Sequence, residues 1–380
     1  MMSLVATPLC RLVALRKGIV DKPDEFLKPH GRPIPYLGGV GIFMGWVAGI
    51  AFAILAFSPE REAASAFASF DPGAGPTINM SLMLVILLAG TVIMALGLLD
   101  DLSVLSPRIK LIVSVAVAGL LLAAGLGDDV IVNATNQVGV TFELPREWWL
   151  VLTYSIPVTV VIIVGASNAT NLIDGLDGLC SGVLAIISLG FLILALHLHV
   201  HRTTELWNSI DGVRVVLSMA LVGASLGFLP MNRNPAKIFM GDAGSMLLGL
   251  NAAIILLLFS EEHRVRWMLA SVMVFGLPVA DMMLALVRRW RAQRPVMTGD
   301  RSHFYDQLVD RGLSVRAVVR ISYGLSALFV AMGLLLTFMR MRHCLLVYAV
   351  FGLGLLYAVH RFGMLRVDHE SAGDDTTDKA

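Results

Sequence analysis

Five aspartates lie at the mouths of apolar runs, where charged side chains are rare. Asp100 and Asp101 close the run LLAGTVIMALGLLDD, Asp174 and Asp177 lie in NATNLIDGLDG, and Asp242 lies in KIFMGDAGS. Carboxylates this close to bilayer depth are costly and usually mark a functional site. Several of them around one water-filled cleft would repel each other unless a cation lay between them. We therefore expect Mg²⁺, with Mn²⁺ as a substitute, because Mg²⁺ takes few protein carboxylates and fills its shell with substrate phosphates.

The motif NATNLIDGLDGL repeats amide and acid side chains every three residues, at Asn168, Asn171, Asp174 and Asp177. On a helix, successive members of such a series lie about 60° apart, so that neighbours share a face. Amides beside carboxylates offer oxygens to a metal and hydrogen bonds to a base or a sugar. The alternative is an ordinary Asn/Asp/Gly turn between two spans, but turns seldom need two amides and two acids. The motif therefore predicts a binding site.

Asp100 and Asp101 are neighbours, so on a helix their side chains diverge by about 100°. They cannot hold one ion in the same way, which predicts distinct roles. Lys110 follows nine residues after Asp101, at the start of the next apolar run in SPRIKLIV. A lysine in this position either snorkels to lipid headgroups or reaches back to a phosphate.

Phe239 precedes Asp242 by three residues, and Gly244 and Ser245 open the apolar run that follows. The N-terminal amides of a helix starting here would favour an anion. An aromatic ring beside a metal-binding acid could stack on a nucleobase. Packing of Phe239 at the membrane interface is the competing interpretation.

The last long polar segment, RRWRAQRPVMTGDRSHFYDQLVDRGLS, combines an arginine cluster with a second group of polar side chains. The arginines before Pro295 are typical of a membrane-flanking anchor. Arg301 and His303, in contrast, suit contacts with a phosphate or a sugar.

The elements that must position these residues are membrane spans. Hydrophobic residues make up 57% of the 380 residues, charged residues 15%, and the mean hydropathy is +0.77. This composition and the length of the apolar runs predict an all-α polytopic membrane protein with about ten or eleven transmembrane helices, and the aspartates at the ends of the runs predict one active-site cleft. An eleventh, partial span is expected at residues 1–15. The ten main spans are expected near residues 37–58, 80–99, 109–126, 149–167, 179–199, 212–230, 244–260, 267–287, 315–338 and 343–360.

Loop charges predict the orientation. If the spans alternate, one side receives residues 16–36, 100–110, 166–178, 231–243, 288–313 and the tail from 361. These segments include all the loops with the five aspartates and hold 18 Lys and Arg, whereas the opposite loops hold 7. The positive-inside rule places the first set, and with it the cleft and the C-terminus, in the cytoplasm. Residues 1–361 then form a single integral-membrane domain, and the acidic tail 362–380 is expected to be disordered. The outer stretch 128–149 has about the length of a β-hairpin. A net charge of +1 points to no nucleic acid partner.

Taken together, these motifs resemble the polyprenyl-phosphate N-acetylhexosamine-1-phosphate transferase family. The resemblance runs over about residues 16–340, in the family's order. It is carried by DKPDEFLKPHGRPIPYLGGVGIF, LGLLDDL, RIKLIV, NATNLIDGLDGL, KIFMGDAGS and DRSHFYDQLVDRGLS. Members of this family are polytopic membrane enzymes that move a sugar 1-phosphate from a UDP-N-acetylhexosamine to a lipid phosphate and release UMP. For this chain the resemblance implies a place in the bacterial cytoplasmic membrane. The resemblance implies a Mg²⁺-dependent enzyme that begins a cell-surface glycan, with UDP-GlcNAc and undecaprenyl phosphate as substrates.

The resemblance also implies roles for individual residues. Asn171 and Asp242 match the Mg²⁺-binding pair, and Lys110 matches the lysine that binds the pyrophosphate. Asp177 and Phe239 match the residues that read uracil.

Asp100 and Asp101 match the family's catalytic pair. Asn168, Asp174, Arg301 and His303 complete the expected substrate-binding set.

Four questions stay open at this point. The family's polysaccharide branch carries a histidine-rich HxHH signature where this chain has His303-Phe304-Tyr305-Asp306. This departure leaves the phospho-N-acetylmuramoyl-pentapeptide transferase of peptidoglycan synthesis as a rival. A secondary transporter is a rival from another class, but its polar residues would lie near the bilayer midplane in broken helices. Direct attack by the lipid phosphate and a covalent phospho-aspartate are both compatible with the motifs, as are a monomer and a homodimer.

Overall fold

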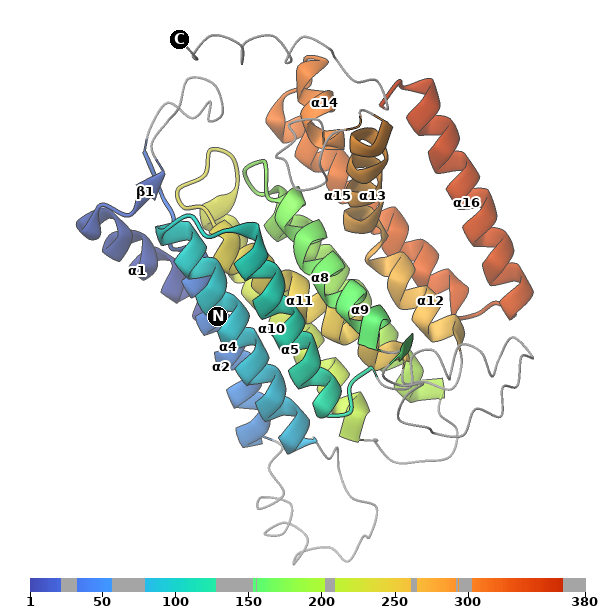
Figure 1. The fold of residues 1–380 in the computed structure, drawn as a ribbon, viewed down its shortest axis with the longest axis horizontal. Coiled ribbons are helices and arrows are strands. Elements are labelled where there is room, and N and C mark those ends of the chain that lie inside the picture. The colour runs from blue at the N-terminus through green and yellow to red at the C-terminus, as the bar shows by residue number, and fades with distance from the viewer. Residues whose placement is uncertain are drawn as a thin grey trace, which may run out of the picture.

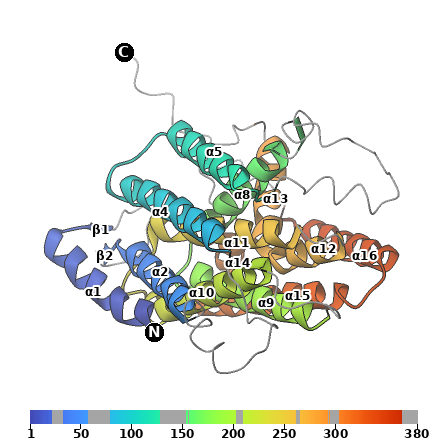
Figure 2. The same ribbon diagram turned by 90° about the horizontal axis from the view of Figure 1, so that it is seen from below.

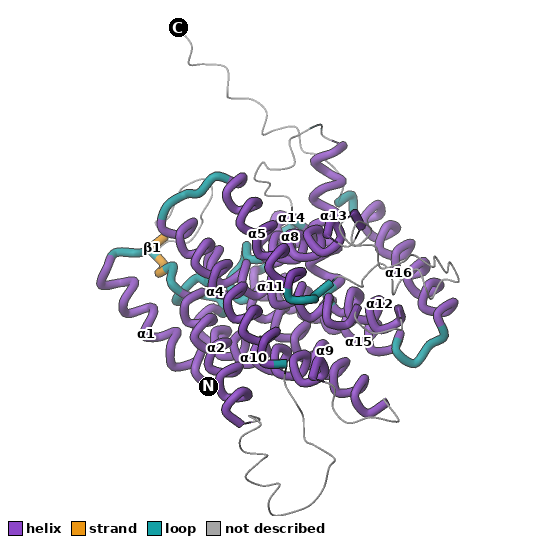
Figure 3. Tube along the Cα trace, turned by 60° about the horizontal axis from the view of Figure 1, so that its bottom comes forward, coloured by secondary structure: helices purple, strands orange, loops and turns teal. Residues whose placement is uncertain are grey.

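The computed structural model describes residues 1–21, 33–56, 79–127, 153–154, 156–201, 209–260, 265–291, 293 and 303–364. Within these ranges the chain forms thirteen helices and one pair of two-residue strands (Figures 1 and 3). The strands β1 (Val20–Asp21) and β2 (Ile34–Pro35) pair antiparallel. The predicted all-α class is confirmed.

Eight helices are long and apolar enough to cross a membrane, and a bent pair of helices makes up to nine among the described residues. The chain is therefore a multi-pass membrane protein. The helices are α1 Met2–Lys17, α2 Gly38–Ala56, α4 Met80–Leu102, α5 Pro107–Ala123, α8 Ile156–Ile173, α9 Leu179–His201, α10 Ser209–Asn232, α11 Gly241–Ser260, α12 Val265–Val274, α13 Gly276–Arg291, α14 Phe304–Asp310, α15 Val315–Leu336 and α16 Met341–Arg361.

Helix α11 is the centre of the bundle. It lies between α4 and α8 on one side and α2 and α10 on the other (Figure 2). Every residue of α11 except Asp242 is buried. Small residues allow this close packing: a Cβ at Gly97 of α4 would come within 2.6 Å of the α11 backbone at Asp242 and Ala243. Close backbone approach through small residues is the usual way in which membrane helices associate.

The helix ends that carry the motifs meet at one end of the bundle. The C-terminal ends of α4, α8 and α10 and the N-terminal ends of α5 and α11 all lie there, because their residues bond to one another. We call this the aspartate end, after Asp101, Asp177 and Asp242. These aspartates therefore lie together at one end of the bundle.

Two predicted spans differ from the observed helices. The span expected at 267–287 is not one straight helix: α12 and α13 meet at an angle of 72°. Pro278 explains the break, since proline has no N–H to donate and fits only the first turn of a helix, here that of α13. The span expected at 149–167 extends further, because α8 continues to Ile173. Asn168 and Asn171 are therefore helical.

Other predictions concern short helices or undescribed segments. The partial span expected at 1–15 forms α1, and the span expected at 109–126 forms the 17-residue α5. The hairpin proposed over 128–149 lies outside the described residues. The tail lies outside them from residue 365 onward.

Candidate active site at the aspartate end

Asp242 is the one residue of the central helix α11 that reaches solvent, with a side chain 25% exposed. It lies in the first turn of α11, where the partial positive charge of the helix N-terminus stabilises an anion. The chain enters this turn through Gly241, whose φ of +65° is a left-handed conformation that favours glycine. A Cβ at Gly241 would also overlap the Asp101 carboxylate. The sequence MGDAG therefore fixes the carboxylate at the mouth of the bundle.

Asp101 holds the start of α11 in place. Its Oδ1 accepts a hydrogen bond of 2.8 Å from the Asp242 N–H, and its Oδ2 accepts one of 3.1 Å from the Ala243 N–H. Both donors belong to the group of N–H groups that a helix start leaves without an intrahelical partner. Asp101, which closes α4, therefore acts as a capping residue for α11 across 141 residues of sequence.

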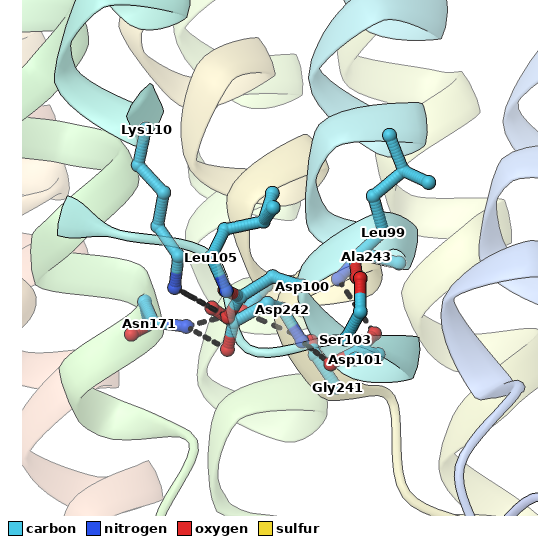
Figure 4. A network of polar contacts seen from close by, with 11 residues as sticks. Leu99, Asp100, Asp101, Ser103, Leu105, Lys110, Asn171, Gly241, Asp242 and Ala243 are labelled. Carbon is cyan, nitrogen blue, oxygen red and sulfur yellow. Dashed lines mark hydrogen bonds and ion pairs between the residues drawn. The ribbon is translucent and has the colours of Figure 1, made fainter. Parts of the chain in front are cut away.

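Asp100 points in another direction and pairs with Lys110 (Figure 4). Its Oδ2 lies 2.5 Å from Lys110 Nζ, and its Oδ1 accepts a hydrogen bond of 2.8 Å from the Leu105 N–H. The same ammonium lies 2.6 Å from Asp242 Oδ2. The predicted division between Asp100 and Asp101 is confirmed in their contacts. Lys110 reaches the acids because the chain turns sharply between α4 and Pro107, the first residue of α5.

Asn171 joins the same cluster from α8. Its amide nitrogen donates to Asp242 Oδ1 at 2.8 Å and to Ser245 Oγ at 3.0 Å, and its carbonyl oxygen points away from Asp242 (Figure 4). Asn168, one turn earlier, is exposed and donates to Val164 O within its own helix. The structure therefore brings Asn171 into the cluster and leaves Asn168 outside its hydrogen bonds.

Asp174 and Asp177 lie beyond the end of α8, so the three-residue repeat does not continue as one helical face. Asp177 Oδ2 accepts hydrogen bonds from the Asn234 side chain at 3.0 Å and from the Ala236 N–H at 2.9 Å. Asn232 accepts from the Gly178 N–H at 3.1 Å, and so helps to tie the two loops together. Sequence reasoning missed Asn232, although an amide closing an apolar run was a usable signal.

Asp174 has no hydrogen-bonded partner for its carboxylate among the described residues. Burial raises its pKa well above the ordinary value, and the negative charges of Asp242, Asp101 and Asp177 raise it further. A nearby cation would stabilise the ionised form of this half-buried carboxylate.

Phe239 lies against the strand that leads into α2. Its N–H donates to Pro35 O at 2.9 Å, and its carbonyl accepts from the Gly38 N–H at 2.9 Å. Its ring meets that of Tyr36 edge to face, with centroids 6.0 Å apart. Burial raises the Tyr36 pKa, as do the charges of Asp21 and of the nearby acids. Tyr36 is a site residue that sequence reasoning did not single out, although it lies in the quoted PIPYLGG segment.

His303 is buried beside an acid that sequence reasoning also missed. Its Nδ1 lies 2.8 Å from Asp281 Oδ2, and the next residue, Phe304, donates its N–H to Asp281 Oδ1 at 3.0 Å. A lone acid inside the apolar run 267–287 was the signal for Asp281. Tyr305 brings the short helix α14 to the cluster, because its hydroxyl donates to Leu172 O at 2.6 Å. Arg301 lies outside the described residues.

The charges at the aspartate end fit a further cation. Asp100 and Asp242 form ion pairs with Lys110, and the negative charges of Asp242 and Asp101 also act on the Asp174 carboxylate. The described residues contain no group of three or more His, Cys, Asp or Glu that could enclose a metal by themselves. Mg²⁺ does not need one, since phosphates and water complete its shell. Asp242 fits as a metal ligand, and Asn171 fits once its carbonyl oxygen turns toward Asp242.

Comparison with known proteins adds a separate line of evidence. Residues 83–260 match the model of glycosyl transferase family 4. A Bacillus subtilis protein, described as a probable undecaprenyl-phosphate N-acetylglucosaminyl 1-phosphate transferase, is 32% identical over 330 residues, which is 86% of this chain and 79% of the relative. The chain belongs to the polyprenyl-phosphate N-acetylhexosamine-1-phosphate transferase family.

Two further relatives show where this chain lies within that family. A Mycobacterium tuberculosis decaprenyl-phosphate N-acetylglucosaminephosphotransferase is 33% identical over 331 residues, covering 84% of this chain and 76% of the relative. A Chlamydia trachomatis phospho-N-acetylmuramoyl-pentapeptide-transferase is 33% identical over only 200 residues, covering 52% and 54%. The similarity to the N-acetylglucosamine relatives therefore extends much further along this polyprenyl-phosphate transferase.

Proposed function

We propose that this protein transfers N-acetylglucosamine 1-phosphate from UDP-GlcNAc to undecaprenyl phosphate and releases UMP, as the first membrane step of a cell-surface glycan. The observation that carries the proposal is the Lys110 ammonium held between Asp100 and Asp242 at the mouth of the buried helix α11. This charge lies where a membrane-embedded lipid phosphate and a water-soluble nucleotide sugar can meet.

The reaction joins two anions. A phosphate oxygen of the lipid attacks the β-phosphorus of the UDP-sugar, and a new P–O bond forms. The bond from the β-phosphorus to the bridging oxygen breaks, and UMP leaves with that electron pair. The second pKa of a phosphate monoester is near 6, so the lipid phosphate is already a competent nucleophile at neutral pH. The harder task is to overcome repulsion between the reactants.

Lys110 serves that task. When the donor pyrophosphate binds to Lys110 in place of Asp242, the ammonium neutralises the charge that develops on the leaving UMP. Asp242 and Asn171 would hold Mg²⁺, which as a Lewis acid supplies further neutralisation of phosphoryl oxygens. Asp101 holds Asp242 in position by accepting hydrogen bonds from the first N–H groups of α11.

The contacts of Asp100 support direct attack by the lipid phosphate. One of its oxygens binds Lys110, and the other accepts the Leu105 N–H. A carboxylate engaged on both oxygens is a weak candidate for a covalent phospho-aspartate. Asp100 orients Lys110 and accepts any proton that remains on the lipid phosphate.

Donor recognition divides between two regions. Phe239 and Asp177 lie on neighbouring loops and would contact uracil, which every UDP-sugar shares. His303 lies on the separate α14 segment and, with Arg301, would contact the hexosamine. The greater extent of similarity to the N-acetylglucosamine relatives supports GlcNAc over a muramyl pentapeptide.

We place the protein in the bacterial cytoplasmic membrane, with the aspartate end in the cytoplasm. The bias of 18 against 7 basic residues supports this orientation. UDP-sugars are cytoplasmic metabolites, so the orientation agrees with the chemistry.

The test uses the purified protein in lipid nanodiscs with undecaprenyl phosphate and Mg²⁺. Release of UMP is compared for UDP-GlcNAc, UDP-GalNAc and UDP-MurNAc-pentapeptide, with Lys110→Met as the matched inactive control. We expect UMP from UDP-GlcNAc with wild type and at least about 10²-fold less with the control. Release of UMP from the muramyl donor alone would contradict the proposal.

A further inference from the structure

Asp281 is a buried carboxylate inside the bent pair α12–α13, and none of the roles above uses it. The residue is 2% exposed, and its side chain is fully buried. Burial of a carboxylate is costly unless hydrogen bonds satisfy both oxygens. Here the partners are two consecutive residues of another segment: His303 at 2.8 Å and the Phe304 N–H at 3.0 Å. One side chain of α13 therefore fixes both the ring and the backbone at the start of α14.

The contact with Asp281 selects one form of the His303 ring. An ionised carboxylate only accepts hydrogen bonds, so the Nδ1 of His303 must carry the hydrogen. In the neutral imidazole, Nε2 then keeps a lone pair and is directed away from Asp281. A donor such as a sugar hydroxyl or an acetamido N–H can bond to it.

Tyr305, two residues after His303, fixes the same segment to α8 beside Asn171. The His303 and Tyr305 rings stack with their centroids 5.5 Å apart and their planes 8° apart. The Tyr305 hydroxyl bonds to Leu172 O, next to Asn171, and its ring lies against Gly175. The imidazole therefore has a fixed position relative to α8 and to the loop that carries Asp174.

We propose that Asp281 is the positioning residue for recognition of the donor sugar, holding His303 in the Nδ1–H form so that Nε2 accepts a hydrogen bond from the hexosamine. This inference deepens the proposed function and rests on it. Asp281 touches neither substrate in this account and acts only through His303. A residue that orients another in this way commonly contributes 10- to 100-fold to affinity or activity, by analogy with outer-shell partners of metal ligands.

A double-mutant cycle tests the proposal. Asp281→Asn keeps the shape of the side chain but loses the charge that fixes the tautomer, and His303→Ala removes the ring. We expect each variant to lower kcat/KM for UDP-GlcNAc by about 10- to 100-fold, mainly through KM. The double variant should be no worse than His303→Ala alone, because Asp281 acts through that ring. Losses that multiply would overturn the proposal, as would a normal kcat/KM in Asp281→Asn.

A binding measurement separates this proposal from the proposed function. The rise in unfolding temperature caused by UDP-GlcNAc is compared with that caused by UMP, which lacks the sugar. We expect Asp281→Asn to lose most of the additional rise from UDP-GlcNAc and to keep the rise from UMP. Equal loss of both would show a structural role and overturn the proposal. If wild type binds UDP-GlcNAc but releases no UMP, the proposed transfer fails, and the binding comparison still decides the role of Asp281.

A matched control removes a charge from α14, the helix that begins directly after His303, without touching the Asp281–His303 pair. Asp310 is the exposed last residue of α14. Asp310→Asn should keep the wild-type kcat/KM and the full rise in unfolding temperature with UDP-GlcNAc. A loss as large as that of Asp281→Asn would mean that general charge, and not the contact with His303, controls recognition, which would also overturn the proposal.

Discussion

Asp101 accepts a hydrogen bond of 2.8 Å from the backbone N–H of Asp242, and so one aspartate of the site positions another. The bond joins the last turn of α4 to the first turn of α11. Because Asp101 bonds to backbone, Asp242 keeps both carboxylate oxygens for Lys110 and Asn171. Asp101 therefore caps α11, and Asp242 makes the charged contact with Lys110.

Substitution of Asp101 tests this division. Asp101→Ala leaves two N–H groups at the start of α11 without an acceptor, so we expect a loss of about 1 kcal/mol in the free energy of unfolding together with a large fall in kcat. Asp101→Asn keeps one acceptor oxygen, so its stability and its kcat should lie between those of wild type and those of Asp101→Ala. Denaturant unfolding and UMP release measure the two effects. Unchanged stability in Asp101→Ala would show that the cap contributes nothing.

Asp242→Asn tests the charged contact. The variant keeps the volume of the side chain but removes the charge that faces Lys110 and the expected metal. We expect turnover to fall at least about 10²-fold, the scale of one strong electrostatic contact. Removal of Mg²⁺ with a chelator should abolish wild-type turnover, and excess Mg²⁺ should restore the variant only in part. Turnover near that of wild type at ordinary Mg²⁺ would place the ion elsewhere.

Asp306 makes stability depend on pH. Burial raises its pKa from 3.8 to about 6, although a hydrogen bond from the His303 backbone opposes the shift. The folded state holds the Asp306 proton more tightly than the unfolded state does. The contribution of this proton to the free energy of unfolding is therefore complete below pH 3.8 and is lost as the pH rises through 6.

The Asp306→Asn variant cannot ionise and so escapes that loss. At pH 7.5 we expect it to be more stable than wild type by about 1 to 2 kcal/mol, a reduced figure because the side chain is only partly buried. At pH 5 the advantage should fall to roughly half, because the unfolded state already ionises there while the folded state keeps the proton. Thermal unfolding of both proteins at the two pH values gives the comparison. An equal difference at both values would rule out titration of Asp306 as the cause.

The orientation can be tested with single cysteines, since Cys10, Cys180 and Cys344 are all buried. Val104, in the loop between α4 and α5 at the aspartate end, is 98% exposed, and Phe338, at the opposite end, is 70% exposed. In intact cells, a membrane-impermeant thiol reagent should label Phe338→Cys and spare Val104→Cys. Both should react after the cells are opened. Labelling of Val104→Cys in intact cells would reverse the proposed orientation.

Much of the site was predictable because its signals are local. Apolar runs indicate the spans, and an acid at the mouth of a run is unusual enough to stand out, as Asp242 does. The divergence of Asp100 and Asp101 follows from helical geometry alone. These predictions need only a few neighbouring residues.

The remaining features depend on contacts between distant segments. Asn168 and Asn171 look equivalent in the sequence, yet only Asn171 meets Asp242, because the packing of α8 against α11 decides which one turns inward. Asp281 lies 22 residues before His303 in an apolar run, and no local pattern pairs them. The end of α8 at Ile173 also interrupted the expected helical face.

The fate of the β-phosphate of the donor tests the central proposal most directly. UDP-GlcNAc labelled with ³²P at the β position is incubated with the protein, Mg²⁺ and undecaprenyl phosphate, and the lipid and aqueous phases are then separated. Transfer of the sugar 1-phosphate predicts label in the lipid phase, in an amount equal to the unlabelled UMP released, and none with Lys110→Met. Label that stays in water as UDP, with GlcNAc alone on the lipid, would contradict the account.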